Sequence, residues 1–182
     1  MTRSNFPAVY LLHGMGGSPE GSVSLLQIEL EKCGAKQNYV RPLMPHAKPA
    51  VPPSESVQYL RSLNLPQAAL VVGISMGGLV AAKLQELDRP DLQVICVNSP
   101  TYAGDIELNL RMRRRISLYC SGDKVIAGRT ERWPQLSEAY DLPWLTGHDT
   151  DKHKRALAFI LRGYLKTGRI SWELEHLDDA QD

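Results

Sequence analysis

The amino-acid sequence predicts an α/β protein of three layers, with a mostly parallel six-stranded sheet between two layers of helices. Short apolar runs alternate along the chain with longer segments in which apolar residues recur at helical spacing. The apolar runs lack the alternation of apolar and polar residues that a half-exposed strand shows, as expected for strands covered on both faces. Repeated units of strand, helix and strand build a parallel sheet through right-handed crossovers.

Six apolar runs are predicted as strands, and the last of them is placed at an edge of the sheet. Pro143 lies in the sixth run, and a proline in a central strand would remove a hydrogen bond from the ladder to its neighbour. An edge position avoids that loss because one side of the strand is unpaired. The runs, in chain order, are Ala8–Leu12, Tyr39–Leu43, Ala68–Ile74, Leu92–Val97, Ile116–Cys120 and Ala139–Leu145.

Five segments between or after these runs carry apolar residues at helical spacing and are predicted as helices. Gly34 and Pro90 lie just beyond the first and third segments, where residues that stop helices are common. Ser54 precedes the second segment in the position of an N-terminal cap. The segments are Glu20–Cys33, a short helix after Ser54 with Val57, Leu60 and Leu63 on one face, Met76–Leu87, the shorter Ile106–Met112, and about Asp151–Lys166.

Length and composition indicate one globular domain without a nucleic-acid partner or a membrane span. The chain has 182 residues, of which 43% are hydrophobic and 23% charged, as in ordinary globular proteins. Its 21 Lys and Arg residues are balanced by 20 Asp and Glu, so the basic excess of a nucleic-acid binder is missing. No apolar run approaches the roughly 18 residues that a membrane span needs. The domain is predicted over residues 1–170, with residues 171–182 as a solvated acidic tail.

The N-terminal residues and the cysteines favour a cytoplasmic protein. Residues 1–7 lack the apolar core of a signal peptide. The three cysteines, Cys33, Cys96 and Cys120, cannot all form internal disulfides because their number is odd. They are also too far apart in sequence for a metal or redox motif, so a reducing compartment suits them.

A basic run, formed by four arginines, precedes the fifth predicted strand. We expect it at the end of the short helix over Ile106–Met112, where cations interact favourably with the helix dipole and stay in water. The run is therefore interpreted as a solvated surface and not as a site for an acidic partner. Its members are Arg111, Arg113, Arg114 and Arg115.

The sharpest chemical signal is the segment Gly73-Ile74-Ser75-Met76-Gly77, which joins an apolar strand to a helix. The pattern GxSxG is weak by itself, but the strand–turn–helix setting is the one that a nucleophile elbow requires. A sharp turn holds Ser75 in an unfavourable backbone conformation, and the flanking glycines avoid clashes with neighbouring elements. The serine also lies at a helix N-terminus, where free N–H groups favour developing negative charge. A phosphate loop, the main alternative, needs the spacing GxxxxGK[ST], which is absent.

A second glycine-rich turn, His-Gly-Met-Gly-Gly at residues 13–17, follows the first strand. Glycines let the backbone approach another segment closely, so this loop can direct an N–H group at the space above Ser75. The alternative is a dinucleotide-binding turn, but Pro19 stands where the pattern GxGxxG needs its last glycine. The second strand also ends without the acidic residue that binds a ribose in such folds. We therefore interpret the turn as part of the serine site.

A serine hydroxyl is a poor nucleophile alone, so a base and an orienting acid must lie at the same edge of the sheet. His148 follows the last strand, and loops at the carboxyl ends of parallel strands open on one side, so we expect it beside Ser75. Asp123 follows the fifth strand and is the predicted acid, with Asp105 after the fourth strand in reserve. The other histidines and aspartates weighed for these roles are His13, His46, His153, His176, Asp149 and Asp151.

The chain resembles the α/β-hydrolase superfamily, and within it the small serine esterases and lipases. The order Ser, Asp, His along the chain matches the order of that superfamily. The resemblance covers about residues 8 to 166 and implies a minimal six-stranded version of the fold without a lid, because the segment between the fourth and fifth strands is short. It rests on His13-Gly14 after the first strand, the Gly73–Gly77 elbow, Ser121-Gly122-Asp123 after a later strand and Gly147-His148 after the last.

Together with the chemistry of these side chains, the resemblance implies a mechanism through an acyl-enzyme, with no metal and no organic cofactor. Ser75 attacks an acyl carbonyl, His148 takes its proton and returns it to the leaving group, and Asp123 orients the imidazole. The backbone N–H groups of Met15 and Met76 hold the oxyanion. Water then hydrolyses the acyl-enzyme.

The predicted substrate is a small-molecule carboxylic ester, with a thioester or an amide as alternatives. His13, Met44 and Tyr102 are the candidate substrate-binding residues at the expected rim, where ordinary packing explains the apolar ones equally well. Acyl transfer to an acceptor other than water uses the same residues. A non-catalytic binding module of the same fold is a further alternative, which the presence of all three triad residues disfavours.

Overall fold

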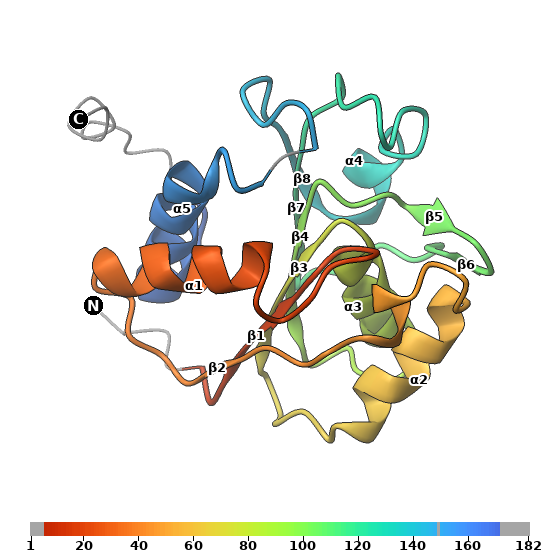
Figure 1. Cartoon of the computed structure of the whole chain (residues 1–182), viewed down its shortest axis with the longest axis horizontal. Helices are drawn as coiled ribbons and strands as arrows, with labels where there is room; N and C mark the ends of the chain where they lie inside the picture. Colours follow the sequence, from red (N-terminus) through yellow and green to blue (C-terminus); the bar gives the residue numbers. More distant parts are fainter. Residues whose placement is uncertain (1–5, 149, 172–182) are drawn as a thin grey trace.

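The computed structural model describes residues 6–148 and 150–171, which form three layers (Figure 1). The middle layer is a six-stranded sheet in which all neighbouring strands are parallel, in the order β2-β1-β3-β4-β7-β8. This architecture is the predicted one. The strands of the sheet are β1 (Val9–Leu12), β2 (Tyr39–Val40), β3 (Leu70–Ile74), β4 (Gln93–Val97), β7 (Arg115–Tyr119) and β8 (Glu138–Asp141).

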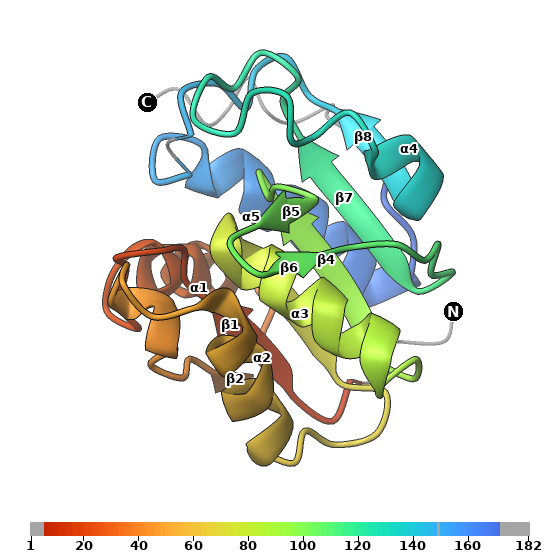
Figure 2. The same cartoon turned by 90° about the vertical axis from the view of Figure 1, so that its right-hand side faces the viewer.

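Helices cover both faces of this sheet. In Figure 1, α1 and α5 lie together on one face, and α2 and α3 lie on the other. A small antiparallel pair, β5 (Tyr102–Ala103) and β6 (Ile106–Glu107), lies outside the main sheet (Figure 2). The helices are α1 (Ser22–Lys32), α2 (Pro53–Ser62), α3 (Met76–Leu87), α4 (Trp133–Leu136) and α5 (Lys154–Thr167), with a 3-10 turn η1 (Pro45–Ala47) before α2.

Alternate residues of each central strand face the two helical layers. In β1, Tyr10 and Leu12 pack into the cluster that includes α2 and α3, whereas Val9 and Leu11 pack into the cluster that includes α1 and α5. All four side chains are buried, so the strand is apolar along its whole length. Each such side chain stabilises the fold by roughly 1.5–3 kcal/mol when it leaves water.

The last strand, β8, lies at an edge of the sheet and pairs only with β7 among the described strands. It ends at Asp141, two positions before Pro143. The N–H of Leu142 still donates to the carbonyl oxygen of Tyr119, at 2.6 Å, so the ladder continues up to the proline. The edge position predicted from this proline is confirmed.

The helix predicted over Ile106–Met112 is wrong. Ile106 instead begins β6 and pairs with Ala103 of β5. The carboxylate of Glu86, on α3, accepts the N–H groups of Asn109 and Leu110, both at 3.0 Å. These amides therefore find their acceptor on a neighbouring helix and need no helix of their own.

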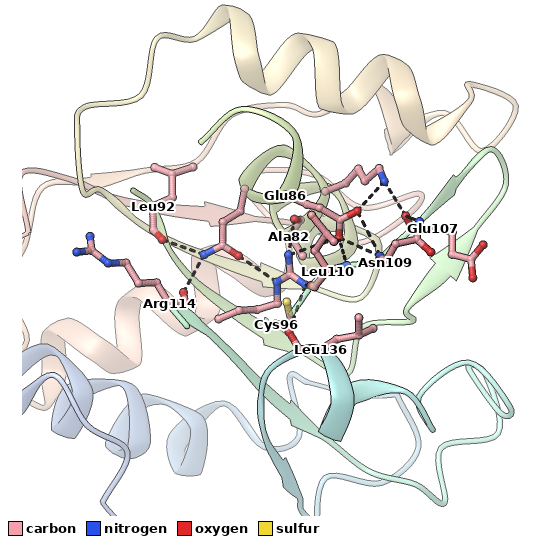
Figure 3. A network of polar contacts seen from close by, with 12 residues as sticks. Ala82, Glu86, Leu92, Cys96, Glu107, Asn109, Leu110, Arg114 and Leu136 are labelled. Atoms are coloured by element: carbon pink, nitrogen blue, oxygen red, sulfur yellow. Dashed lines mark hydrogen bonds and ion pairs between the residues drawn. The ribbon is translucent and has the colours of Figure 1, made fainter. Parts of the chain in front are cut away.

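The interpretation of the arginine run is wrong for Arg115, which is fully buried in β7, whereas Arg111, Arg113 and Arg114 are exposed. Its guanidinium donates to the side-chain oxygen of Gln85 and to three backbone carbonyl oxygens, and Figure 3 shows the polar network around them. A buried cation is tolerated only when its donors are paired, and burial still lowers the pKa of this guanidinium. The carbonyl acceptors are those of Ala82, Leu110 and Leu136.

Candidate active site

The turn between β3 and α3 has the geometry of a nucleophile elbow. Ser75 has φ +52° and ψ −119°, in a region that non-glycine residues seldom occupy. Its N–H donates to the carbonyl oxygen of Val97 at 2.8 Å, which ties the turn to β4. A Cβ added to Gly73 would overlap the backbone of Gly77, and one added to Gly77 would lie 2.6 Å from the carbonyl oxygen of His13. Both glycines are therefore required by close packing of backbone on backbone.

The structure brings Ser75, His148 and Asp123 together. The Oγ of Ser75 lies 2.8 Å from Nε2 of His148, and Nδ1 of the same ring lies 2.6 Å from Oδ2 of Asp123. A carboxylate can only accept, so Nδ1 carries the proton and Nε2 is free to accept from the serine hydroxyl. Asp123 is 1% exposed, and its second oxygen, Oδ1, accepts the N–H of Val125 at 2.9 Å. The carboxylate is thus buried and has partners on both oxygens.

Two backbone N–H groups beside the serine are unpaired within residues 6–148 and 150–171. Met76 is the first residue of α3, where N–H groups have no partner inside the helix. The loop that carries Met15 passes close to the serine, since a Cβ on Gly14 would lie 3.2 Å from the Cβ of Ser75. The amide of Met15 likewise donates no hydrogen bond among these residues. Donation by these two groups to an oxyanion stays a prediction.

Solved structures share this arrangement of layers. MGS-MChE2, an alpha/beta hydrolase enzyme from the metagenome of lagoon sediments at Mar Chica, Morocco, has a TM-score of 0.68 at 13% identity, over 89% of this chain and 91% of its own. The ydeN gene product of B. subtilis has a TM-score of 0.65 at 15% identity, over 86% and 97%. An alpha-beta serine hydrolase homologue from Coxiella burnetii has a TM-score of 0.59 at 17% identity, over 87% and 83%. No protein-family model and no curated protein sequence matches the chain.

The chain has the α/β-hydrolase fold. At these identities the likeness establishes the arrangement of strands and helices, and one fold carries many activities. The activity of this chain therefore depends on the side chains at the carboxyl edge of its sheet.

Within this α/β-hydrolase fold, two buried histidines brace the loop after β1. The Nε2 of His13 accepts the N–H of Met44 at 3.0 Å, and its Nδ1 lies 2.8 Å from the carbonyl oxygen of Gly14. The Nε2 of His46 donates to the carbonyl oxygen of His13 at 2.8 Å, and the carbonyl oxygen of His46 accepts the N–H of Gly16 at 3.0 Å. The two rings meet edge to face with their centres 5.1 Å apart. The loop that carries Met15 is thereby held at both ends.

The candidate substrate-binding residues have different surroundings. His13 and Met44 are each 1% exposed, and the ring nitrogens of His13 are occupied by the loop contacts. Tyr102 is 43% exposed at the start of β5. Contact of these three residues with a substrate stays a prediction.

The reserve acid and the other histidines are engaged elsewhere. Asp105 accepts the N–H of Ser54 at 3.1 Å and also its hydroxyl, near the start of α2. The ring of His153, just before α5, packs edge to face on Trp144 with centres 5.6 Å apart. His176 and Asp149 lie outside the described residues.

Within the described ranges no cluster of His, Cys, Asp and Glu could hold a metal ion, and no helix is long and apolar enough to cross a bilayer.

The buried histidine pair predicts a pH-dependent stability. Burial lowers the pKa of His46 to about 4, from 6.5 in the unfolded chain, and lowers the pKa of His13 as well. Between these values the unfolded chain binds the proton and the folded chain does not, so stability falls as pH drops from about 6.5 to 4. For His46 the loss reaches about 3 kcal/mol at the lower limit.

His46→Gln tests this expectation, because glutamine keeps a donor for the carbonyl of His13 but cannot titrate. Denaturant unfolding of wild type and variant should be compared at intervals from pH 7 to pH 4. We expect the free energy of unfolding to fall less steeply with acid in the variant. Equal slopes for the two proteins would contradict the role given to His46.

Proposed function

We propose that the chain is a serine hydrolase that cleaves a carboxylic ester through an acyl-enzyme on Ser75. One observation carries the proposal, the continuous chain of hydrogen bonds from Ser75 Oγ through His148 to Asp123, at 2.8 and 2.6 Å. A packing role for the serine requires none of these partners. The solved structures that share the fold include named hydrolases, among them a pyrethroid hydrolase from Sphingobium faniae, which supports hydrolysis in general.

The chemistry follows from the roles of the three groups. Ser75 Oγ bonds to the acyl carbon as its proton moves to Nε2 of His148, and Asp123 stabilises the imidazolium so formed. The carbonyl oxygen becomes an oxyanion, to which the N–H groups of Met15 and Met76 donate. Each such donor is typically worth about 10²–10³ in rate. The proton on Nε2 passes to the alcohol as the ester bond breaks, and a water molecule then releases the acid by the same steps.

A fluorophosphonate probe tests the nucleophile directly, because it reacts with activated serines and remains on the oxygen. We expect one probe per chain, located on the peptide that contains Ser75. Ser121→Ala is the matched control, since Ser121 is an exposed serine at the same edge of the sheet, and it should label like the wild type. A protein that takes no probe, or takes it on another serine, would contradict the proposal.

Hydrolysis of p-nitrophenyl esters of graded chain length tests the reaction and reports the preferred acyl group. Acyl thioesters and anilides of the same chain lengths are compared in parallel. The proposal expects the highest kcat/KM on an ester. A higher value on thioesters would move the assignment to a thioesterase, and product formation that requires an added alcohol or amine would indicate an acyltransferase.

A further inference from the structure

Asn98 follows β4 at the centre of the sheet and is fully buried. Its side-chain amide joins two segments that are distant in sequence. Oδ1 accepts the N–H of Cys120 at 3.1 Å, and Nδ2 donates to the carbonyl oxygen of Leu145 at 3.1 Å. The backbone N–H of Asn98 donates in turn to Leu118, at 2.8 Å. A single short amide thus links the ends of β4 and β7 with the loop that follows β8.

The two partners of this amide precede the acid and the base by the same distance along the chain. Cys120 lies three residues before Asp123, and its carbonyl oxygen accepts the N–H of Asp123 at 3.0 Å. Leu145 lies three residues before His148 and is fully buried. The amide therefore fixes one end of each short segment that leads to a member of the hydrogen-bonded pair.

The nucleophile is tied to the same point of the sheet. The residue before Asn98, Val97, accepts the N–H of Ser75 through its carbonyl oxygen at 2.8 Å. Residues 97–98 consequently hold all three loops of the site, one through the backbone and two through the side chain.

The backbone of Asn98 has a positive φ, a conformation that residues other than glycine seldom adopt. Its φ is +43°, and Ser75 and His148 also have positive φ values, +52° and +56°. Residues held in such sparsely populated conformations cluster at functional sites, where the surrounding structure imposes them. Asparagine tolerates this region better than most residues do, so the position requires both its backbone freedom and its amide.

We propose that Asn98 is a positioning residue that sets the distance and angle between Asp123, His148 and Ser75. The proposal rests on the hydrolase function proposed above. Asn98 touches neither substrate nor the reacting atoms and acts through the two loops. The Asn98 amide offers an acceptor and a donor on two atoms of one short group, and the N–H of Cys120 and the carbonyl of Leu145 use both at the same time.

The main test compares Asn98→Gly with Gln85→Ala. Glycine adopts a positive φ without strain, so the first variant deletes the amide and spares the backbone. Gln85 is the control for loss of a buried amide, because it is also fully buried and its Oε1 accepts from the guanidinium of Arg115, so its removal is expected to destabilise the fold without touching the site. Its Nε2 donates to the carbonyls of Leu92 and Arg114, which precede β4 and β7 at the opposite end of the sheet.

We expect Asn98→Gly to lower kcat about 10- to 100-fold, since small displacements of catalytic groups cost rates of this order. The KM should change less than threefold, because the residue contacts no substrate. Gln85→Ala should keep kcat within twofold of the wild type, even if its thermal midpoint falls as much as that of Asn98→Gly. A kcat for Asn98→Gly equal to that of the control would overturn the proposal.

A second measurement does not depend on turnover. The proton on Nδ1 of His148, which is shared with Asp123, is expected to give a far-downfield NMR signal in the wild type and in Gln85→Ala. This signal should be absent from the spectrum of Asn98→Gly. Asn98→Asp keeps the acceptor for Cys120 and the backbone freedom, and it carries the test where the glycine variant does not fold. Retention of the signal in the Asn98 variants would overturn the positioning role.

These measurements separate the two proposals. A wild-type protein that neither takes the fluorophosphonate nor hydrolyses any ester overturns the proposed function. The NMR signal of such a protein still reports whether Asn98 holds the loops of His148 and Asp123 together. Full activity in both Asn98 variants overturns only the role of Asn98.

Discussion

Ser75→Ala is expected to lower kcat for ester hydrolysis by about 10⁶-fold, the size of loss that removal of a triad serine causes in other enzymes. The loss is this large because the variant has no oxygen to form the acyl-enzyme, and His148 and Asp123 then have no nucleophile to activate. The fold should persist. Alanine keeps the Cβ that Ser75 already holds at φ +52°, and the serine hydroxyl forms no capping bond at the start of α3.

Steady-state kinetics and thermal unfolding of the same preparation separate these two effects. Ser121→Ala, the exposed serine control, should retain both kcat and the thermal midpoint. Ser75→Ala should retain only the midpoint. Turnover of the Ser75 variant within tenfold of the wild type would place the nucleophile on another residue.

The sequence allowed the closeness of the three predicted triad side chains to be foreseen, because parallel sheets impose a simple rule. Every strand runs in the same direction, so the loops after β3, β7 and β8 open at one edge whatever their separation in sequence. Ser75, Asp123 and His148 each follow one of these strands, and the structure brings them within hydrogen-bond distance. Their catalytic roles stay predictions until the labelling and kinetic experiments are done.

The features that were missed or predicted wrongly depend on contacts between elements. The segment over Ile106–Met112 has a helical pattern, but Glu86 captures two of its amides. Arg115 is read as solvated in a run of arginines, yet the carbonyl groups around it satisfy its donors. No spacing rule identifies such partners.

The supporting residues of the site were hidden for a related reason. The sequence offers His46 only as one of several histidines that could act as the base, because nothing in it places this ring beside the carbonyl of His13. Asn98 stands at the end of a strand, where a polar residue is ordinary. The only signal in the sequence was that asparagine tolerates a positive φ. This signal points to a role only when the hydrogen bonds of its amide to Cys120 and Leu145 are known.

Among the glycine-to-alanine substitutions near the site, Gly73→Ala is expected to cause the largest loss of stability. The new Cβ would overlap backbone atoms of Gly77 and Gly78. A flexible side chain could move aside, but here α3 would have to move away from β3. Overpacking typically costs 1–3 kcal/mol and sometimes more, against a total stability of about 5–15 kcal/mol. Because the atoms in the way belong to the backbone of α3 and cannot rotate aside, we expect the free energy of unfolding to fall by the upper part of that range, or the chain to fail to fold.

Gly122→Ala is the matched control, since Gly122 also lies at the carboxyl edge and its added Cβ would meet only the sulfur of Cys120, at 3.6 Å. Denaturant unfolding of both variants measures the difference, and the Gly122 variant should lie within about 1 kcal/mol of the wild type, as for most tolerated substitutions. A similarly small change for Gly73→Ala would mean that β3 and α3 can separate at no cost. The elbow would then not be held by packing, and the positive φ of Ser75 would need another cause. If Ser75→Ala folds but is inactive, and Gly73→Ala does not fold, then within this five-residue turn the serine is needed for the reaction and the glycine for the backbone geometry.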